Sequence, residues 1–167
     1  MIALRKKAAR APADVEQQLA GFIDKFEPRN RTLIRAVRRA LRKRLPTAYE
    51  LAYDNYNFFV IGYSPTERPS DAILSIAASA TGVGLCFLYG ATLRDPAKIL
   101  KGSGNQTRSI HLESADVLAR PDVESLIAAA IAQSRTPFRS TGRRQLIVRS
   151  VSAKQRPRRR GASRTPI

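Results

Sequence analysis

The chain has 167 residues, 43% of them hydrophobic, which is enough for one domain with an apolar core. A single cysteine, Cys86, excludes an internal disulfide and suits a reducing cytoplasm, where we expect the protein. No apolar run is long enough to cross a bilayer, and one histidine with one cysteine excludes a zinc site built from these ligands.

The formal net charge of +17 is concentrated at the two ends of the chain. Residues 1–12 carry four basic residues, residues 139–167 carry ten, neither range holds an acid, and residues 13–138 have a net charge of +3. We therefore expect a disordered basic arm at 1–12, an α+β domain at 13–136 and a largely disordered tail at 137–167, in which 145–151 can form a short strand. Such ends attract nucleic acid or another polyanion without reading its sequence.

Apolar residues at helical spacing predict one helix from Ala13 to the break at Glu27-Pro28, and a second from about Arg29 to Leu45. The polar side of the second helix is basic, which is typical of a phosphate-binding face and equally of a solvated amphipathic helix. The candidate polyanion-binding residues on this helix and in the tail are Arg31, Arg35, Arg38, Arg39, Arg42, Arg156, Arg158, Arg159 and Arg160.

Aromatic and β-branched residues predict strands within 49–63 and at 72–78, 83–89 and 108–112, and a helical pattern runs from about 121 to 134. The connections between these strands are too short for helical crossovers. We therefore expect an α+β fold in which an antiparallel sheet of about four to five strands packs against N-terminal and C-terminal helices.

The segment LRDPAKILKGSGNQTRSIHL (93–112) combines glycines with positive charge. Asp95 before Pro96 predicts the start of a short helix that ends at Gly102. A bare backbone near Lys101 and Arg108 could hold an anion, and the alternative is a helix cap followed by a tight turn.

A second polar and aromatic cluster, Tyr53 to Asn57, could line a small-molecule pocket or form a structural corner. If it lines a pocket, we expect the fold to join it to the glycine-containing segment in one concave site. The candidate ligand- or anion-binding residues of the two segments are Tyr53, Asp54, Asn55, Tyr56, Asn57, Lys101, Gly102, Ser103, Gly104 and Arg108.

Catalytic chemistry has little support in the sequence. His111 is the single histidine, no nucleophile elbow or dinucleotide fingerprint is present, and the 13 acids are scattered. We expect no catalytic residues, no metal and no cofactor, and the sequence favours a binding protein over an enzyme.

The segments YELAYDNYNFFVIGYSPTERPSDAILSIA (49–77) and LCFLYGATLRDPAKILKGSGNQTRSIHL (85–112), with the helix that follows, resemble a bacterial domain-of-unknown-function family, the YdhG-like family. The tail QLIVRSVSAKQRPRRR also looks like endings found in that family. The resemblance covers roughly residues 14–134 and implies a small α+β domain related in shape to frataxin. It implies no catalytic residues. One branch of the family has been proposed to act as an intracellular iron chaperone, so a small-ligand or iron-binding role is the alternative to polyanion binding.

Overall fold

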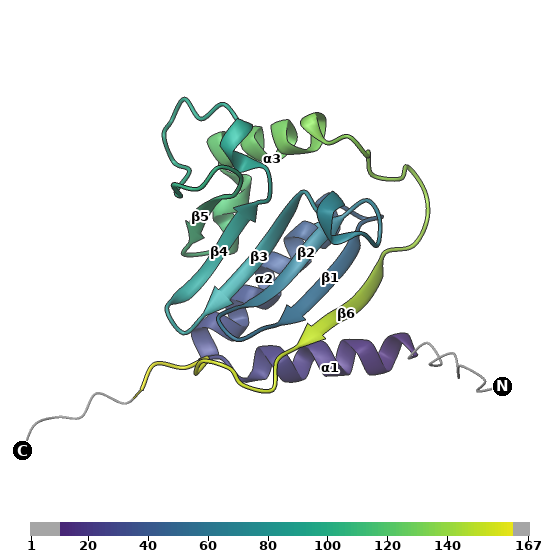
Figure 1. Cartoon of the computed structure of the whole chain (residues 1–167), viewed down its shortest axis with the longest axis vertical. Coiled ribbons are helices and arrows are strands. Elements are labelled where there is room, and N and C mark those ends of the chain that lie inside the picture. The colour runs from purple at the N-terminus through teal and green to yellow at the C-terminus, as the bar shows by residue number, and fades with distance from the viewer. Residues whose placement is uncertain (1–10, 162–167) are drawn as a thin grey trace, which may run out of the picture.

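Three helices lie on one side of a six-stranded sheet in the computed structural model, which describes residues 11–161 (Figure 1). The helices are α1 (Pro12–Asp24), α2 (Pro28–Arg44) and α3 (Pro121–Gln133). The strands are β1 (Tyr49–Asp54), β2 (Phe59–Ser64), β3 (Leu74–Ser79), β4 (Gly82–Phe87), β5 (Arg108–Leu112) and β6 (Gln145–Val151). Three short 3-10 turns complete the fold, η1 (Pro69–Asp71), η2 (Gly90–Thr92) and η3 (Ala115–Ala119).

The helices lie where the local sequence signals place them. A proline occupies the start of each of the three, where its missing amide proton costs no helical hydrogen bond. Pro28 also separates α1 from α2, because a proline inside a continuous helix would remove a hydrogen bond and clash with the preceding turn. The α+β class and the helical segments expected from apolar spacing are therefore confirmed.

The sheet has the strand order β5-β4-β3-β2-β1-β6. Neighbours from β1 to β5 are antiparallel, whereas β6 runs parallel to β1, with Tyr49 opposite Gln145 and Asp54 opposite Val151. The expectation of four to five antiparallel strands is thus wrong in number and in direction. The reason is the long connection through α3, which carries the chain from the β5 edge back to the β1 edge (Figure 1).

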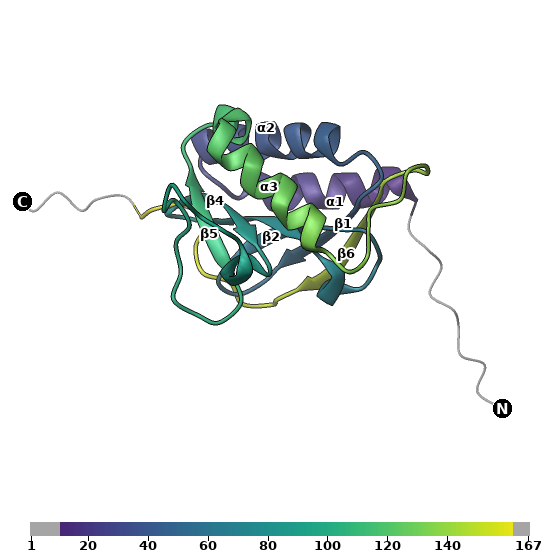
Figure 2. The ribbon, with the colours of Figure 1, turned by 90° about the horizontal axis from the view of Figure 1, so that it is seen from above.

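The core lies between the sheet and the helices, which all cover the same face (Figure 2). Phe59 of β2 is fully buried, and its ring centroid lies 6.2 Å from that of Phe22 on α1 and 6.0 Å from that of Phe26, just after α1. Ile34 and Val37 of α2 are also fully buried. Burial of these side chains, each contributing about 1.5–3 kcal/mol, fixes the two leading helices against the strands.

The short helix expected between Asp95 and Gly102 is absent. The Asp95 carboxylate accepts hydrogen bonds from the backbone amides of Ile99 at 3.0 Å and Leu100 at 2.9 Å, and Lys98 has a φ of 52°. A side chain that bonds the backbone locally gives a turn as readily as a helix start, and the left-handed Lys98 prevents propagation of the helix. Gly102 does adopt the expected positive φ, at 132°, but as part of a loop.

The segment after residue 137 also differs from the expectation of a largely disordered tail. The strand that 145–151 was expected to be able to form is β6, and the chain beyond it follows the β1–β2 hairpin. The amide of Ser152 donates to the carbonyl of Asp54 and that of Arg156 to the carbonyl of Tyr56, both at 2.9 Å. The tail is therefore folded onto the domain as far as Arg160, whose amide donates to Glu27, and we call residues 152–161 the strap. Residues 1–10 of the expected arm and 162–167 of the tail lie outside the described residues.

Candidate functional site

Strand β1 places a carboxylate, Glu50, on the helix-covered face of the sheet, where only 1% of it is exposed. It accepts hydrogen bonds from Arg38 Nε at 2.9 Å, from Arg42 Nε at 2.8 Å and from the Tyr63 hydroxyl at 3.0 Å. Burial and the charge of Glu50 raise the pKa of Tyr63 well above its ordinary value, so its hydroxyl stays protonated and donates.

Glu16 of α1 completes this cluster from the solvent side. Arg38 donates to it through Nη1 and Nη2, each at 2.9 Å, and Arg42 donates through Nη2. Burial acts to raise the pKa of Glu16, but the hydrogen bonds from Arg38 and Arg42 outweigh it and the pKa is lowered. Arg38 and Arg42, expected on a phosphate-binding face, therefore hold the α1–α2 layer to the sheet.

The remaining arginines expected on that face differ in their partners. Arg35 pairs with Asp24 of α1 at 2.6 Å, and this pair is exposed. Arg31 and Arg39 take part in no ion pair of the described residues, and Arg39 is exposed. The arginines on the inner side of α2, Arg38 and Arg42, are thus paired with acids. On its outer side, Arg39 has no acidic partner among the described residues.

A second buried carboxylate, Asp54, ends β1 with its side chain fully buried. Lys25, directly after α1, has its Nζ 2.6 Å from Oδ2, and Arg158 Nη2 of the strap lies 3.0 Å from Oδ1. Burial acts to raise the pKa of Asp54, but hydrogen bonds from Lys25, Gln155 and Arg158 lower it below its ordinary value. Asp54, expected to bind a ligand, and Arg158, expected to bind a polyanion, thus form an ion pair with each other.

Arg158 is itself buried, with 3% of its side chain exposed. Its Nη2 also donates to the carbonyl of Asn55, and its guanidinium lies 6.0 Å from the ring centroid of Phe26. Its Nε and Nη1 have no hydrogen-bond partner within residues 11–161. Through these contacts the buried Arg158 fixes the strap to the domain, and it is not a surface cation.

The neighbouring arginines of the strap also contact the domain. Arg159 donates from Nε to the carbonyl of Lys25 at 3.1 Å, at the C-terminus of α1, where a positive charge is favourable. Arg156 lies 5.8 Å from the ring centroid of Tyr56, and the amide of Arg160 donates to Glu27 at 3.0 Å. The four strap arginines expected to reach a polyanion are thus all engaged with the domain, three through side chains and Arg160 through its backbone.

The pocket expected to join the Tyr53–Asn57 segment to the glycine-containing loop is not formed. Tyr53 and Asp54 end β1, and the exposed residues Asn55, Tyr56 and Asn57 belong to the β1–β2 hairpin turn. In the sheet register, Asp54 lies opposite Phe59 at one end of the strands. Arg108 lies opposite Phe87 at the other end, where the loop leaves β4 (Figure 1). The two segments are therefore too far apart to share a ligand.

The glycine-containing loop is supported by its own residues. Arg108 Nη1 donates to the carbonyl of Gly104 at 2.6 Å and to that of Thr107 at 2.9 Å. The backbone of Lys101 pairs with that of Ser109 as an isolated bridge, and Gly102 and Ser103 are exposed beside it. Arg108 thus braces the loop, which corresponds to the structural alternative of a tight turn.

The structure gathers another set of cations that sequence reasoning did not group. The turn at 139–144 packs against the C-terminal end of α2, because Arg144 Nη1 donates to the carbonyl of Arg42 at 3.3 Å. Thr47, just after α2, donates from its hydroxyl to the carbonyl of Arg139 at 2.6 Å. We call the resulting surface the basic end, and its residues are Arg39, Lys43, Arg139, Arg143 and Arg144.

No residue of the basic end belongs to an ion pair among residues 11–161. Neither α2 nor the segment 137–161 contains an acid, so nothing in these two segments can neutralise the surface. The signal in the sequence for this surface was the pair Arg143 and Arg144, directly before an apolar strand pattern. The pair can be assigned to the end of α2 only once β6 is known to pair with β1.

Potential metal-ligating side chains are not clustered in the part of the chain that the structure describes. Within 11–161, no group of three or more histidine, cysteine, aspartate or glutamate side chains is arranged to hold a metal ion. Burial raises the pKa of the Cys86 thiol, which disfavours the nucleophilic thiolate. In the same range, no helix combines the length and the apolar character that crossing a membrane requires.

Comparison with protein-family models, with curated proteins and with solved structures finds no match to this chain.

Proposed function

We propose that this chain is a non-enzymatic protein of the YdhG-like family, with a frataxin-like arrangement, that binds the phosphate backbone of nucleic acids through the basic end. The family proposal rests on the resembling segments at 49–77 and 85–112, and the α+β order of helices and strands is compatible with it. The binding proposal rests on the cations that the fold leaves without acidic partners.

The observation that carries the binding proposal is the contact between Arg144 and the carbonyl of Arg42, 102 residues apart in the chain. It places Arg144, with Arg143 beside it in the chain, at the C-terminal end of α2, which carries Lys43 and, one helical turn earlier, Arg39. Lysine and arginine side chains contact phosphates without reading bases, so we expect binding with little sequence preference.

Acids elsewhere narrow the choice of surface. Glu16 and Glu50 neutralise Arg38 and Arg42, and Asp54 neutralises Arg158. A phosphate could reach these arginines only by displacing a carboxylate that is already in place and partly or fully buried. The basic end requires no such exchange, which favours it over the inner face of α2 and over Arg158.

The test is a salt series of duplex DNA binding by fluorescence anisotropy, with a duplex of mixed sequence and the full chain. The variant Lys43→Ala/Arg143→Ala/Arg144→Ala should bind more weakly, and the slope of log K against log salt should fall by about 2–3, because each lost phosphate contact removes roughly 0.9. Truncation at residue 136 is not a suitable variant, because it would delete β6 and the strap.

A matched control removes the same charge elsewhere. The variant Arg68→Ala/Arg94→Ala/Lys101→Ala changes three exposed cations outside the basic end and should leave the salt slope close to that of the wild type. Equal losses in the two variants would show diffuse attraction to the whole surface and would overturn the assignment to the basic end. Wild-type affinity independent of salt would overturn phosphate binding altogether.

The iron-binding alternative gains no support from the described acids. Glu16 and Asp24 of α1 are paired with arginines, and Glu27 accepts the amide of Arg160. A small-ligand role has a different basis, in a pocket that involves none of the residues expected from sequence.

A further inference from the structure

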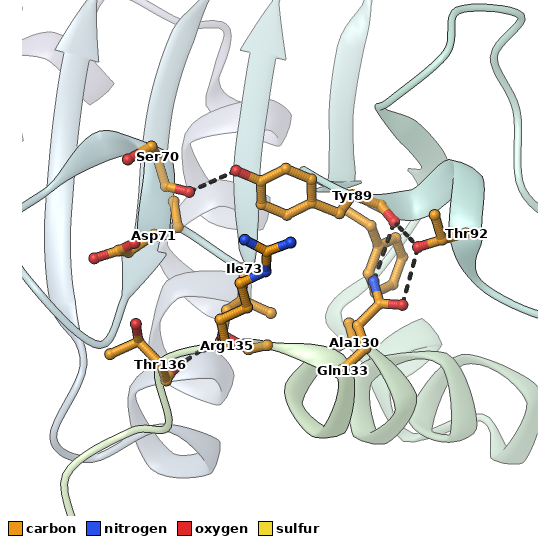
Figure 3. A pocket seen from close by; sticks show the side chains of 12 residues that line it. Ser70, Asp71, Ile73, Tyr89, Thr92, Ala130, Gln133, Arg135 and Thr136 are labelled. Atoms are coloured by element: carbon orange, nitrogen blue, oxygen red, sulfur yellow. Dashed lines mark hydrogen bonds between the residues drawn. The ribbon is translucent and has the colours of Figure 1, made fainter.

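A pocket of about 500 Å³ opens between the C-terminal end of α3, the end of β4 and the turn η1 (Figure 3). This volume lies in the range of small-molecule sites, about 300–1,000 Å³. The side of the pocket next to the core is apolar, with Ile73, Phe87 and Ala130 each no more than 4% exposed. The pocket lies at the end of the sheet away from Asp54 and the strap, since Phe87 and Asp54 are at opposite ends of the strand register.

Hydrogen bonds hold the polar wall of the pocket in position. The Tyr89 hydroxyl donates to the carbonyl of Ser70 at 2.6 Å, so the ring extends from β4 toward η1 (Figure 3). Gln133 Nε2 donates to the carbonyl of Tyr89 at 3.1 Å, and its Oε1 accepts from the Thr92 hydroxyl at 3.0 Å. A wall that is already ordered loses little conformational freedom when a ligand binds.

Tyr89 is 43% exposed although it is fixed in this way. An aromatic face that is both rigid and solvent-exposed is a surface on which a planar ligand can stack. Ile73 and Phe87, which are buried, form the apolar floor of the pocket.

Arg135 supplies a cation to the same space. Figure 3 shows its guanidinium extending from the chain after α3 toward the gap between Ser70 and Tyr89. Arg135 has no hydrogen bond or ion pair in the described part of the chain. Asp71 is the one acid of the pocket lining, and its Oδ2 instead accepts from the Thr66 hydroxyl at 2.7 Å. The lining therefore carries one cation and one carboxylate, and among the described residues Arg135 forms no ion pair with Asp71 or with any other acid.

We infer that this pocket binds a small molecule that has a planar apolar body and one anionic group, a carboxylate or a phosphate. The anion pairs with Arg135, whose planar guanidinium can donate two parallel hydrogen bonds to either group. The planar body lies against the exposed ring of Tyr89, above the buried floor that Ile73 and Phe87 form. This site shares no residue with the basic end. Ligand binding in the pocket can therefore be tested independently of the proposed nucleic-acid binding.

The inference can be tested by NMR titration of the full chain with benzoate, phenyl phosphate and benzylamine, following the methyl groups of Ala72, Thr92 and Ala130. Benzoate, phenyl phosphate or both should cause saturable shifts of these methyl groups, and benzylamine should not. Saturation by only one of the two anions identifies a carboxylate or a phosphate as the preferred group. Inorganic phosphate alone should bind more weakly than phenyl phosphate, because it lacks the planar body.

Two variants separate the pocket from general attraction of anions. Arg135→Gln should weaken binding of the preferred probe at least tenfold, the loss typical of one charged hydrogen-bonding partner. Arg94→Gln, the same change at an exposed arginine outside the pocket lining, should leave the affinity unchanged. The inference is overturned if benzylamine binds as well as the anions, if Arg135→Gln has no effect, or if no probe gives saturable shifts in the millimolar range.

Discussion

Two groups of cations are similar in residue type but differ in their surroundings. They are the inner arginines, by which we mean Arg38 and Arg158, and the basic end. Arg38 and Arg158 reach carboxylates buried in the sheet, at 2.9 Å from Glu50 and 3.0 Å from Asp54. Arg143 and Arg144 are exposed and belong to no ion pair of residues 11–161. The comparison shows that the net positive charge of a chain does not predict where it binds phosphate. Buried acids pair with some of the cations and so determine which others are available for a phosphate group.

The largest effect should come from removing the acid at the centre of the inner cluster. Glu50→Ala leaves Arg38, Arg42 and the Tyr63 hydroxyl without their buried acceptor and should lower the free energy of unfolding by about 3–5 kcal/mol. Urea denaturation measures the loss. Glu50→Gln, which retains an acceptor oxygen, should lose less, and a loss below about 1 kcal/mol in Glu50→Ala would contradict a structural role for the cluster.

A smaller loss is expected at the strap. Arg158→Ala should cost about 2–3 kcal/mol of unfolding free energy, because Asp54 keeps Lys25 as a partner when the strap arginine is removed. The matched control is Arg156→Ala, which removes an exposed guanidinium beside Tyr56 and should cost no more than about 1 kcal/mol. Equal losses in the two variants would show that the buried contacts of Arg158 do not hold the strap to the domain.

Acid should weaken the same contact. Because the pKa of Asp54 is lowered in the folded protein, its ionised form contributes stability that is complete above the pKa of the unfolded chain and is lost as pH falls through the folded pKa. The stability difference between wild type and Asp54→Asn, from urea denaturation at a series of pH values, should therefore shrink below about pH 4. Parallel stability curves down to acid unfolding would rule out this linkage.

The smallest effect on stability is expected at the basic end. Replacing Lys43, Arg143 and Arg144 by alanine should change the free energy of unfolding by no more than about 0.5 kcal/mol per site, because these side chains are exposed and have no acidic partner. Thermal unfolding measures this directly. A loss as large as that of Arg158→Ala would mean that these residues are structural, and the comparison between the two groups would fail.

The helices and most strands could be predicted because their signals are local. Apolar spacing and Pro28 and Pro121 place the helices, and alternating Ile110 and Leu112 mark β5, where both are buried. The helix expected after Asp95 failed because the same carboxylate can start a helix or close a turn on the amides of Ile99 and Leu100.

The pairing of distant segments could not be predicted. Nothing in 145–151 specifies a parallel partner, and the contact between Asp54 and Arg158 spans 104 residues. Five expected ligand residues therefore became parts of a strand end, a hairpin turn and an ion pair. The pocket beside Arg135 was missed because its lining comes from separate segments, whose residues are individually ordinary.

The most direct test follows the arginine Nε–Hε NMR resonances of the full chain while duplex DNA of mixed sequence is added. We expect the resonances of Arg143 and Arg144 to shift or broaden at saturation, whereas those of Arg38 and Arg158 keep their positions. Equal changes at Arg158 and Arg144, or changes confined to Arg38 and Arg158, would contradict the division into inner arginines and a basic end.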